Sequence, residues 1–167
     1  SDSDRRLWII DGVHFPGSDV FHMTRDPRSG RLLAAVNSVV WGPEIQRSDD
    51  FGASWSGASE APRFADGGGY AGQSVSRVWH IEPGRPSEPD VVYLGAQPAS
   101  LFRSEDGGER SAEVPGLSSH PTQPDWKPGL GGLILHSLAL DPYDTARMWV
   151  GISAVGVFRT EDAGESS

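Results

Sequence analysis

The sequence contains no cysteine, which excludes disulfide bonds and leaves a cytoplasmic and a secreted location equally open. It has no apolar run approaching the roughly 18 residues that a membrane-spanning helix needs, so no membrane partner is predicted. Basic residues are scarce, with 14 Lys and Arg against 23 Asp and Glu, for a net charge of −9. Because phosphate binding needs a basic surface, this balance excludes nucleic acid as a partner.

Helical periodicity is also missing, since no segment keeps it over about 11 residues. The chain of 167 residues is instead rich in turn formers, with 21 Gly and 13 Pro. One stretch occurs three times, as "RSDDFGASW" (47–55), "RSEDGGERS" (103–111) and "RTEDAGESS" (159–167). We call each stretch a box. Asp50, Asp106 and Asp162 recur every 56 residues (106 − 50 and 162 − 106), and a fixed period of this kind indicates a repeat architecture.

The boxes are predicted to be structural hairpin turns that touch no ligand. An Asp in a tight turn accepts hydrogen bonds from the backbone N–H groups just ahead of it, and a Ser or Thr hydroxyl adds another. Glycine supplies a position with positive φ. The aromatic ring that closes the first box is replaced by Ser111 and Ser167 in the others. The predicted structural box residues are Ser48, Asp50, Gly52, Trp55, Ser104, Asp106, Gly108, Thr160, Asp162 and Gly164.

Short β-rich runs precede each box, and each unit reads as four antiparallel strands, with turns such as those at Asp26 and Asp141 between them. Four short strands every fifty or so residues predict an all-β fold of β-propeller blades, about three in this chain. The predicted blades are residues 11–58, 59–114 and 115–167, and residues 1–10 are an outer strand that completes another blade.

The boxes, together with "VFHMTRDPRSGRLLAAVN", "RVWHIEPG" and "SAVGVFRTEDAG", resemble the BNR/Asp-box repeat β-propeller family. This family includes sialidases, sortilin-like domains and bacterial glycosyl hydrolase-like repeat proteins of unassigned activity, and the segments look most like the last group. The resemblance implies a propeller of four-stranded blades. It implies no activity, because one fold serves many functions.

Propellers close with about 4–8 blades, so a three-bladed chain is expected to be a fragment or an engineered part of a larger ring. The run "RLWII" (6–10) reads as an outer strand, and the third blade lacks one. The sequence therefore predicts self-assembly through these complementary ends, with a six-bladed homodimer favoured.

The five histidines fall at the starts of the predicted blades. His22, His80 and His136 lie in the first strand of each blade, which lines the channel, while His14 and His120 lie in the segments leading there. Three interpretations stay open: a divalent metal held by His22 and His80, contact with a polar ligand, or structural hydrogen bonding. When the three first strands are aligned on Met23, Ile81 and Leu138, His22 and His80 fall at the same position, that is, in the same phase. His136 falls one residue earlier.

The long segments before these strands emerge on the face opposite the boxes, and long loops on that face favour a binding site at the channel mouth. The loop from His120 to Trp126 is expected to overhang His22 and His80. Trp126 is expected to be exposed, Trp79 is assigned to the core, and Tyr70 is a further candidate for stacking on a sugar. The predicted ligand-binding residues are His22, Arg77, His80, Glu82, His120, Asp125, Trp126 and His136.

Two functions follow from this arrangement. One is a non-catalytic, self-assembling scaffold with a site for a glycan or another polar ligand. The alternative is a sialidase-like glycoside hydrolase, which needs two carboxyl groups about 5–9.5 Å apart. The sequence has neither an evident acid pair nor an arginine triad to favour the hydrolase. Only Arg63 and Arg77 lie on the loop face. The candidate carboxylates are Asp19, Asp66, Glu82 and Asp125.

Overall fold

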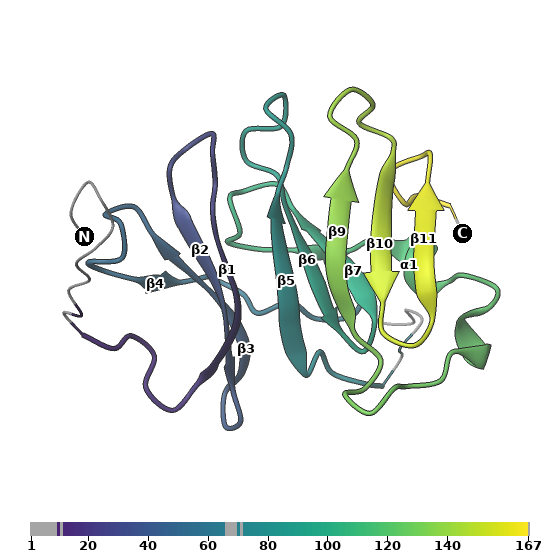
Figure 1. Ribbon diagram of the computed structural model, residues 1–167, viewed down its shortest axis with the longest axis horizontal. Coiled ribbons are helices and arrows are strands. Elements are labelled where there is room, and N and C mark those ends of the chain that lie inside the picture. Colours follow the sequence, from purple (N-terminus) through teal and green to yellow (C-terminus); the bar gives the residue numbers. More distant parts are fainter. Residues whose placement is uncertain (1–9, 11, 66–69, 71, 167) are drawn as a thin grey trace.

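A computed structural model describes residues 10, 12–65, 70 and 72–166. It has three antiparallel β-sheets that lie side by side (Figure 1). The first sheet has four strands in chain order, β1 (Asp19–Arg25), β2 (Leu32–Ser38), β3 (Gly42–Ser48) and β4 (Ser56–Gly57). The second repeats this order with β5 (Arg77–Pro83), β6 (Val92–Gln97), β7 (Ser100–Ser104) and β8 (Ala112–Glu113). The third has β9 (Leu135–Leu140), β10 (Met148–Ile152) and β11 (Gly156–Thr160).

The predicted all-β class is confirmed, and the antiparallel sheets of three and four strands are consistent with a partial propeller. Helical structure within the described part of the chain is limited to α1 (Pro115–Ser118) and a 3₁₀ turn, η1 (Gln123–Asp125). Within that part of the chain, no helix has the length and apolar character needed to cross a bilayer. The predicted outer strand at residues 6–10 lies outside the described residues except for Ile10, which belongs to no strand.

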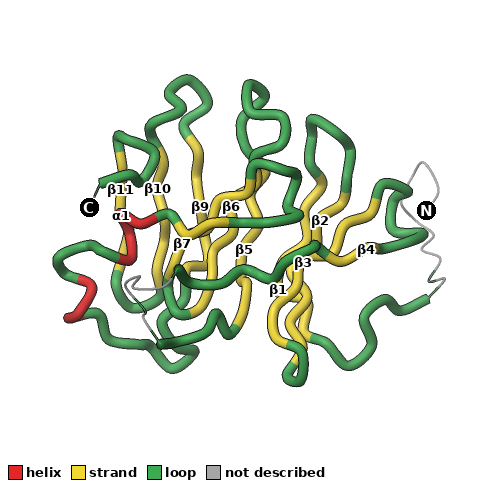
Figure 2. Tube along the Cα trace, turned by 180° about the vertical axis from the view of Figure 1, so that it is seen from behind, coloured by secondary structure: helices red, strands yellow, loops and turns green. Residues whose placement is uncertain are grey.

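The three sheets form a row in which β5 contacts both β1 and β9. Figures 1 and 2 place the sheet of β1–β4 at one end of the row and that of β9–β11 at the other. One apolar cluster fills the space between the first and second sheets and a second fills that between the second and third. Strand β6 is buried along almost its whole length because sheets cover both of its faces.

Close approach of the second and third sheets depends on Gly95 in β6. A Cβ atom at this position would lie 2.6 Å from the backbone oxygen of Leu135. Polar contacts add to the packing, because the buried guanidinium of Arg85 donates to the carbonyls of Asp141 (2.7 Å) and Arg147 (2.8 Å).

A similar polar link joins the first and second sheets. The side-chain amide of Asn37 accepts from the backbone N–H of Val78 (2.8 Å) and donates to the Val78 carbonyl (3.1 Å). A buried amide in this position satisfies backbone groups of β5 that face away from β6. The aspartates of the predicted turns are structural as expected, since Asp26 accepts from Arg28 and Asp141 accepts from the N–H groups of Tyr143 and Asp144.

Each box is a turn held by hydrogen bonds to its Ser or Thr hydroxyl and its Asp carboxylate, and the first two turns join β3 to β4 and β7 to β8. In the second box, Ser104 donates its hydroxyl to Asp106 (2.9 Å) and accepts from the Gly108 N–H (2.9 Å). Asp106 also accepts the backbone N–H groups of Glu109 and Arg110. In the first and third boxes the Ser or Thr hydroxyl makes the same two contacts, and the Asp carboxylate accepts the backbone N–H of Ser54 or Ser166. Hydrogen bonds led by those from Ser54 and Ser166 lower the pKa values of Asp50 and Asp162 to about 2.

Each box contains two consecutive residues with the positive φ of the left-handed region, whereas the sequence predicted only one, the glycine. Phe51 precedes Gly52 with a φ of 57°, Gly107 precedes Gly108 with a φ of 71°, and Ala163 precedes Gly164 with a φ of 61°. The network around the aspartate holds the backbone there even where the first residue carries a side chain.

Candidate functional site

The first strand of every sheet contains a β-bulge. These bulges determine which residues of β1, β5 and β9 are structurally equivalent. The pairing with the second strand skips one residue between Val20 and His22, between Val78 and His80, and between Leu135 and Ser137. The bulged residues are Phe21, Trp79 and His136. The predicted phase is thereby confirmed, because His136 occupies the position one residue before the one that His22 and His80 share.

His22 and His80 lie against each other where the first two sheets meet. Their ring centroids are 4.4 Å apart, with the ring planes at 32°. The backbone N–H of Ile81 donates to Nδ1 of His22 (3.1 Å), and Nε2 of His80 lies 3.3 Å from Oε2 of Glu82. Burial lowers the pKa of His22, and the neighbouring His80 lowers it further. The bond from Ile81 to His22 is an inter-sheet hydrogen bond of the kind that the structural interpretation of the histidines requires, whereas the contact between His80 and Glu82 lies within β5.

A metal centre needs more ligands than this pair supplies. Zinc sites use at least three protein ligands, and Nδ1 of His22 is already engaged by Ile81. Among the residues that the structure describes, no group of three or more His, Cys, Asp or Glu side chains is arranged to hold a metal ion.

An aromatic pair lies beside the histidines, at the starts of β1 and β5 and therefore toward the face opposite the boxes. The rings of Phe21 and Trp79 stack with centroids 4.0 Å apart and planes at 10°. The guanidinium carbon of Arg77 lies 5.9 Å from the centroid of Phe21. Trp79 donates its indole N–H to the side-chain oxygen of Gln97 (3.0 Å), and all four side chains are half-buried.

We call Phe21, Arg77, Trp79 and Gln97 the mouth cluster. It places two half-buried aromatic rings next to a cation and a side-chain amide, a combination that can contact a polar ligand with an apolar face. Sequence reasoning selected Arg77 but assigned Trp79 to the core and passed over Phe21. The usable signal was the parallel between "VFH" at 20–22 and "VWH" at 78–80.

Trp126 contradicts its predicted exposure, because only 9% of the residue is accessible. Its ring lies 6.2 Å from that of His120 and 5.1 Å from that of Phe158 in β11. The loop from His120 to Trp126 therefore packs against the third sheet, and the expectation that it overhangs His22 and His80 is wrong. Asp125 stays exposed in η1.

Trp126 is buried because it belongs to a second repeat, which the sequence analysis did not detect. Phe64, Tyr70 and Phe102 pack together between the first and second sheets, with ring centroids 5.3 Å and 5.7 Å apart. His120, Trp126 and Phe158 follow them at the same spacing of 56 residues (120 − 64, 126 − 70 and 158 − 102). Tyr70 is 5% exposed and donates its hydroxyl to the Ala99 carbonyl, so it too belongs to the core rather than to a sugar site.

The other predicted site residues are dispersed. His136 is exposed on β9, Asp19 is exposed at the start of β1, and Glu82 adjoins His80. Arg63 is exposed and lies 3.6 Å from Glu60. Asp66 lies outside the described residues. The structure brings together His22, His80, Glu82 and Arg77 on the inner strands, and it places His120 and Trp126 elsewhere.

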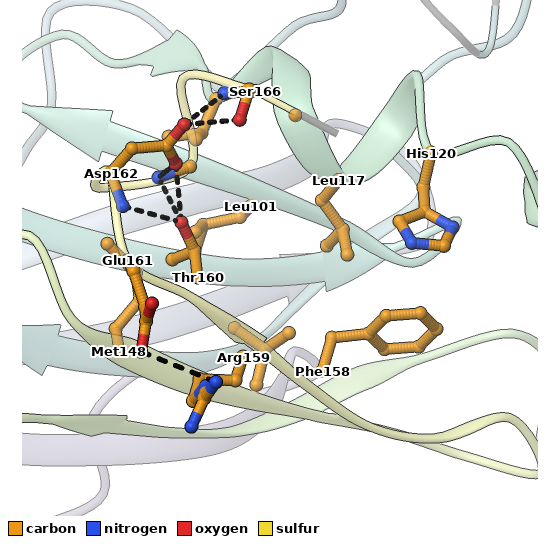
Figure 3. Close-up of a pocket in the computed structure, with 14 residues that line it drawn as sticks. Leu101, Leu117, His120, Met148, Phe158, Arg159, Thr160, Glu161, Asp162 and Ser166 are labelled. Carbon is orange, nitrogen blue, oxygen red and sulfur yellow. Dashed lines mark hydrogen bonds and ion pairs between the residues drawn. The ribbon is translucent and has the colours of Figure 1, made fainter.

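A groove of about 410 Å³ separates the second sheet from the edge strand of the third (Figure 3). Leu101, Leu117 and Met148 supply its apolar surface. Figure 3 shows Phe158 and His120 toward one end of the groove, and the third box, with Asp162 and Ser166, toward the other.

No protein-family model matches the sequence, and no curated protein matches it. Among solved structures, the fold is similar to that of a xyloglucanase of glycoside hydrolase family 74 from Xanthomonas campestris, a β-propeller enzyme, with a TM-score of 0.59. The two sequences are 17% identical over the match, which covers 90% of this chain and 22% of the enzyme. The chain thus spans about a fifth of that protein's length, and the likeness shows the fold alone.

Proposed function

We propose that this chain supplies three blades of BNR/Asp-box type to a larger β-propeller and binds a carbohydrate, without catalysis, at the mouth cluster. The blades are those within residues 11–58, 59–114 and 115–167. Inner strands β1, β5 and β9 carry the ligand-facing side chains, and the boxes stabilise the hairpins on the opposite face.

The observation that carries the proposal is the stack of Phe21 on Trp79 beside Arg77. Aromatic faces pack against the apolar C–H face of a sugar ring, while Arg77 and Gln97 offer donors and an acceptor to its hydroxyl groups. His136 holds the equivalent bulge position in the third sheet and is exposed, so it extends the same row of side chains. Carbohydrate as the ligand class also agrees with the activity by which the xyloglucanase neighbour is named.

The hydrolase alternative gains no support from the described carboxylates. A glycosidase needs an acid pair on either side of the scissile bond. Glu82 is the carboxylate of the inner strands next to the histidine pair, and it is already in contact with His80. Asp19 and Asp125 lie on separate elements, at the start of β1 and in η1.

Titration of the intact chain with xyloglucan oligosaccharides and with N-acetylneuraminic acid, followed by calorimetry and by tryptophan fluorescence, tests the proposal. Saturable binding to a sugar is expected, and Trp79→Ala should weaken it at least tenfold, or about 1.4 kcal/mol. Trp79→Phe keeps a stacking ring and should retain most of the affinity.

Trp41→Ala is the matched control, because Trp41 is 88% exposed in the turn between β2 and β3 and belongs to no inner strand. It should leave the affinity unchanged. Absence of binding to either sugar, or equal losses in Trp79→Ala and Trp41→Ala, would refute the mouth cluster as a carbohydrate site.

A further inference from the structure

The loop that leads into β9 packs directly on the mouth cluster. Gly132 in this loop lies so close to Gln97 that a Cβ atom added to it would be 2.5 Å from Nε2 of the glutamine amide. Its φ of 106° is positive, in a region that glycine adopts without strain. A glycine is therefore required at this position for the loop to reach the Gln97 side chain.

Gln97 connects this loop to the aromatic stack. It ends β6 opposite Arg77, and its side-chain oxygen accepts the indole N–H of Trp79 across 3.0 Å. The amide thus faces Trp79 with its oxygen and Gly132 with its nitrogen. A shift of the loop would move the amide, and the amide would then no longer hold the indole in its present orientation.

The loop is anchored on both sides of this contact. Trp126 before it and Ile134 after it are both buried. The N–H of Gly132 donates to the Gly129 carbonyl (3.0 Å), which closes a tight turn. Gly129 in addition adjoins the β10–β11 turn, where a Cβ atom added to it would lie 3.4 Å from that of Ala154. These contacts fix the turn in place beside the mouth cluster.

Leu130 lies at the tip of this turn, and its side chain is fully exposed. Tight turns usually carry glycine, proline or short polar residues, so a large apolar side chain at the tip is unusual. Full exposure means that Leu130 adds nothing to the core of the folded chain. Because the turn rests on Gln97, Leu130 belongs to the loop that bounds the mouth cluster, on the face where β5 and β9 begin (Figure 1).

We propose that the turn of residues 129–132 forms one wall of the carbohydrate site. Gly132 positions the Gln97 amide, and Leu130 packs against the apolar C–H face of the sugar. The site then extends from the first sheet, which supplies Phe21, to the loop that leads into the third. This inference rests on the carbohydrate function proposed above, and it names Leu130 as a further binding residue of that site.

Leu130→Ser tests the wall, because a fully exposed side chain can be replaced without altering the fold. In calorimetric titration with xyloglucan oligosaccharides, this variant should bind about fivefold more weakly than the unaltered chain, through loss of apolar contact. Val39→Ser is the matched control, since Val39 is 92% exposed in the β2–β3 turn of the first sheet. It should leave the affinity unchanged.

Gly132→Ala tests the positioning of Gln97 without any sugar. The added methyl group would displace the amide from Trp79 and should shift the tryptophan emission. The same substitution in a Trp79→Phe background should give no shift. Gly131→Ala is the control, because its methyl group would meet Ile134 at an ordinary 3.5 Å. Circular dichroism of each variant checks that the fold is retained.

Equal affinities of Leu130→Ser and Val39→Ser, in a chain whose sugar binding is weakened by Trp79→Ala, would overturn the wall and leave the proposed function standing. No emission shift in Gly132→Ala, or one that persists in the Trp79→Phe background, would disprove the positioning of the amide. Absence of sugar binding by the unaltered chain would instead refute the proposed function, and the wall with it.

Discussion

Ile81 donates its backbone N–H to Nδ1 of His22 across 3.1 Å, and this hydrogen bond joins the first strand of one sheet to the first strand of the next. Only an unprotonated imidazole nitrogen can accept it. Burial and the adjacent His80 both lower the pKa of His22, and Glu82 raises it by less. Packing of the first two sheets through this bond therefore requires neutral His22.

Stability should fall as the solution is acidified through the range in which an unfolded histidine becomes protonated. The folded pKa of His22 lies below its ordinary value of 6.5, so below that pH the unfolded chain binds more protons than the folded one. The free energy of unfolding is then highest above pH 6.5 and decreases as the pH falls toward the folded pKa. Urea denaturation at intervals from pH 7.5 to pH 5 measures this slope.

His22→Phe should remove much of the slope, whereas His136→Gln, which changes an exposed imidazole, should retain it. A further loss of stability below pH 4 is expected in every variant, because hydrogen bonds hold the pKa values of Asp50 and Asp162 near 2 in the folded chain. Identical slopes for His22→Phe and the unaltered chain above pH 5 would contradict the role of His22.

Asp106→Ala should lower the free energy of unfolding by about 1–3 kcal/mol, the usual cost of leaving turn donors without their acceptor. The carboxylate accepts from the backbone N–H groups of Glu109 and Arg110 and from the hydroxyl of Ser104. Asp49→Ala is a suitable control, since the side chain of this exposed residue of the first box pairs, among the described residues, with that of Arg31. A smaller loss for Asp106→Ala than for Asp49→Ala in thermal unfolding would show that the box network contributes little. Sugar affinity should be unchanged in both.

Gly95→Ala should destabilise the contact between the second and third sheets by about 1–3 kcal/mol, as overpacking of a core does. The added methyl group would meet the backbone oxygen of Leu135, which cannot move without shifting β9. Gly131→Ala places its methyl group at an ordinary 3.5 Å from Ile134 and should be nearly neutral. Chemical denaturation compares the two, and equal midpoints would argue against close packing at Gly95.

Ser111→Trp should stabilise the second hairpin by up to about 1.5–3 kcal/mol if the indole is covered. In the first box, Trp55 lies over Gly52 and donates its indole N–H to the Gly52 carbonyl at 3.1 Å. Ser111 instead lines an open cleft of about 860 Å³ together with Tyr93 and Arg103, so an indole has room there. Ser111→Ala controls for loss of the hydroxyl. An unchanged or lower melting temperature for Ser111→Trp would mean that the cleft has repacked around serine.

Local patterns predicted the strands, the box hydrogen bonds and the shared phase of His22 and His80, because each depends on neighbours in the chain. Packing between sheets was harder to predict. Trp126 lies in a Pro-rich loop typical of exposed segments, yet it is buried because Phe158, far along the chain, supplies its contact surface. In the sequence, Asn37 looks like any polar residue at the end of a strand. Its role in binding Val78 of β5 depends on how the first two sheets pack.

The central claim is that the mouth cluster binds a carbohydrate, and calorimetric titration of the unaltered, Trp79→Ala and Trp41→Ala chains tests it most directly. Saturable binding of a xyloglucan oligosaccharide is expected, weakened at least tenfold by Trp79→Ala and unchanged by Trp41→Ala. No saturable binding, or equal losses in the two variants, would contradict the claim.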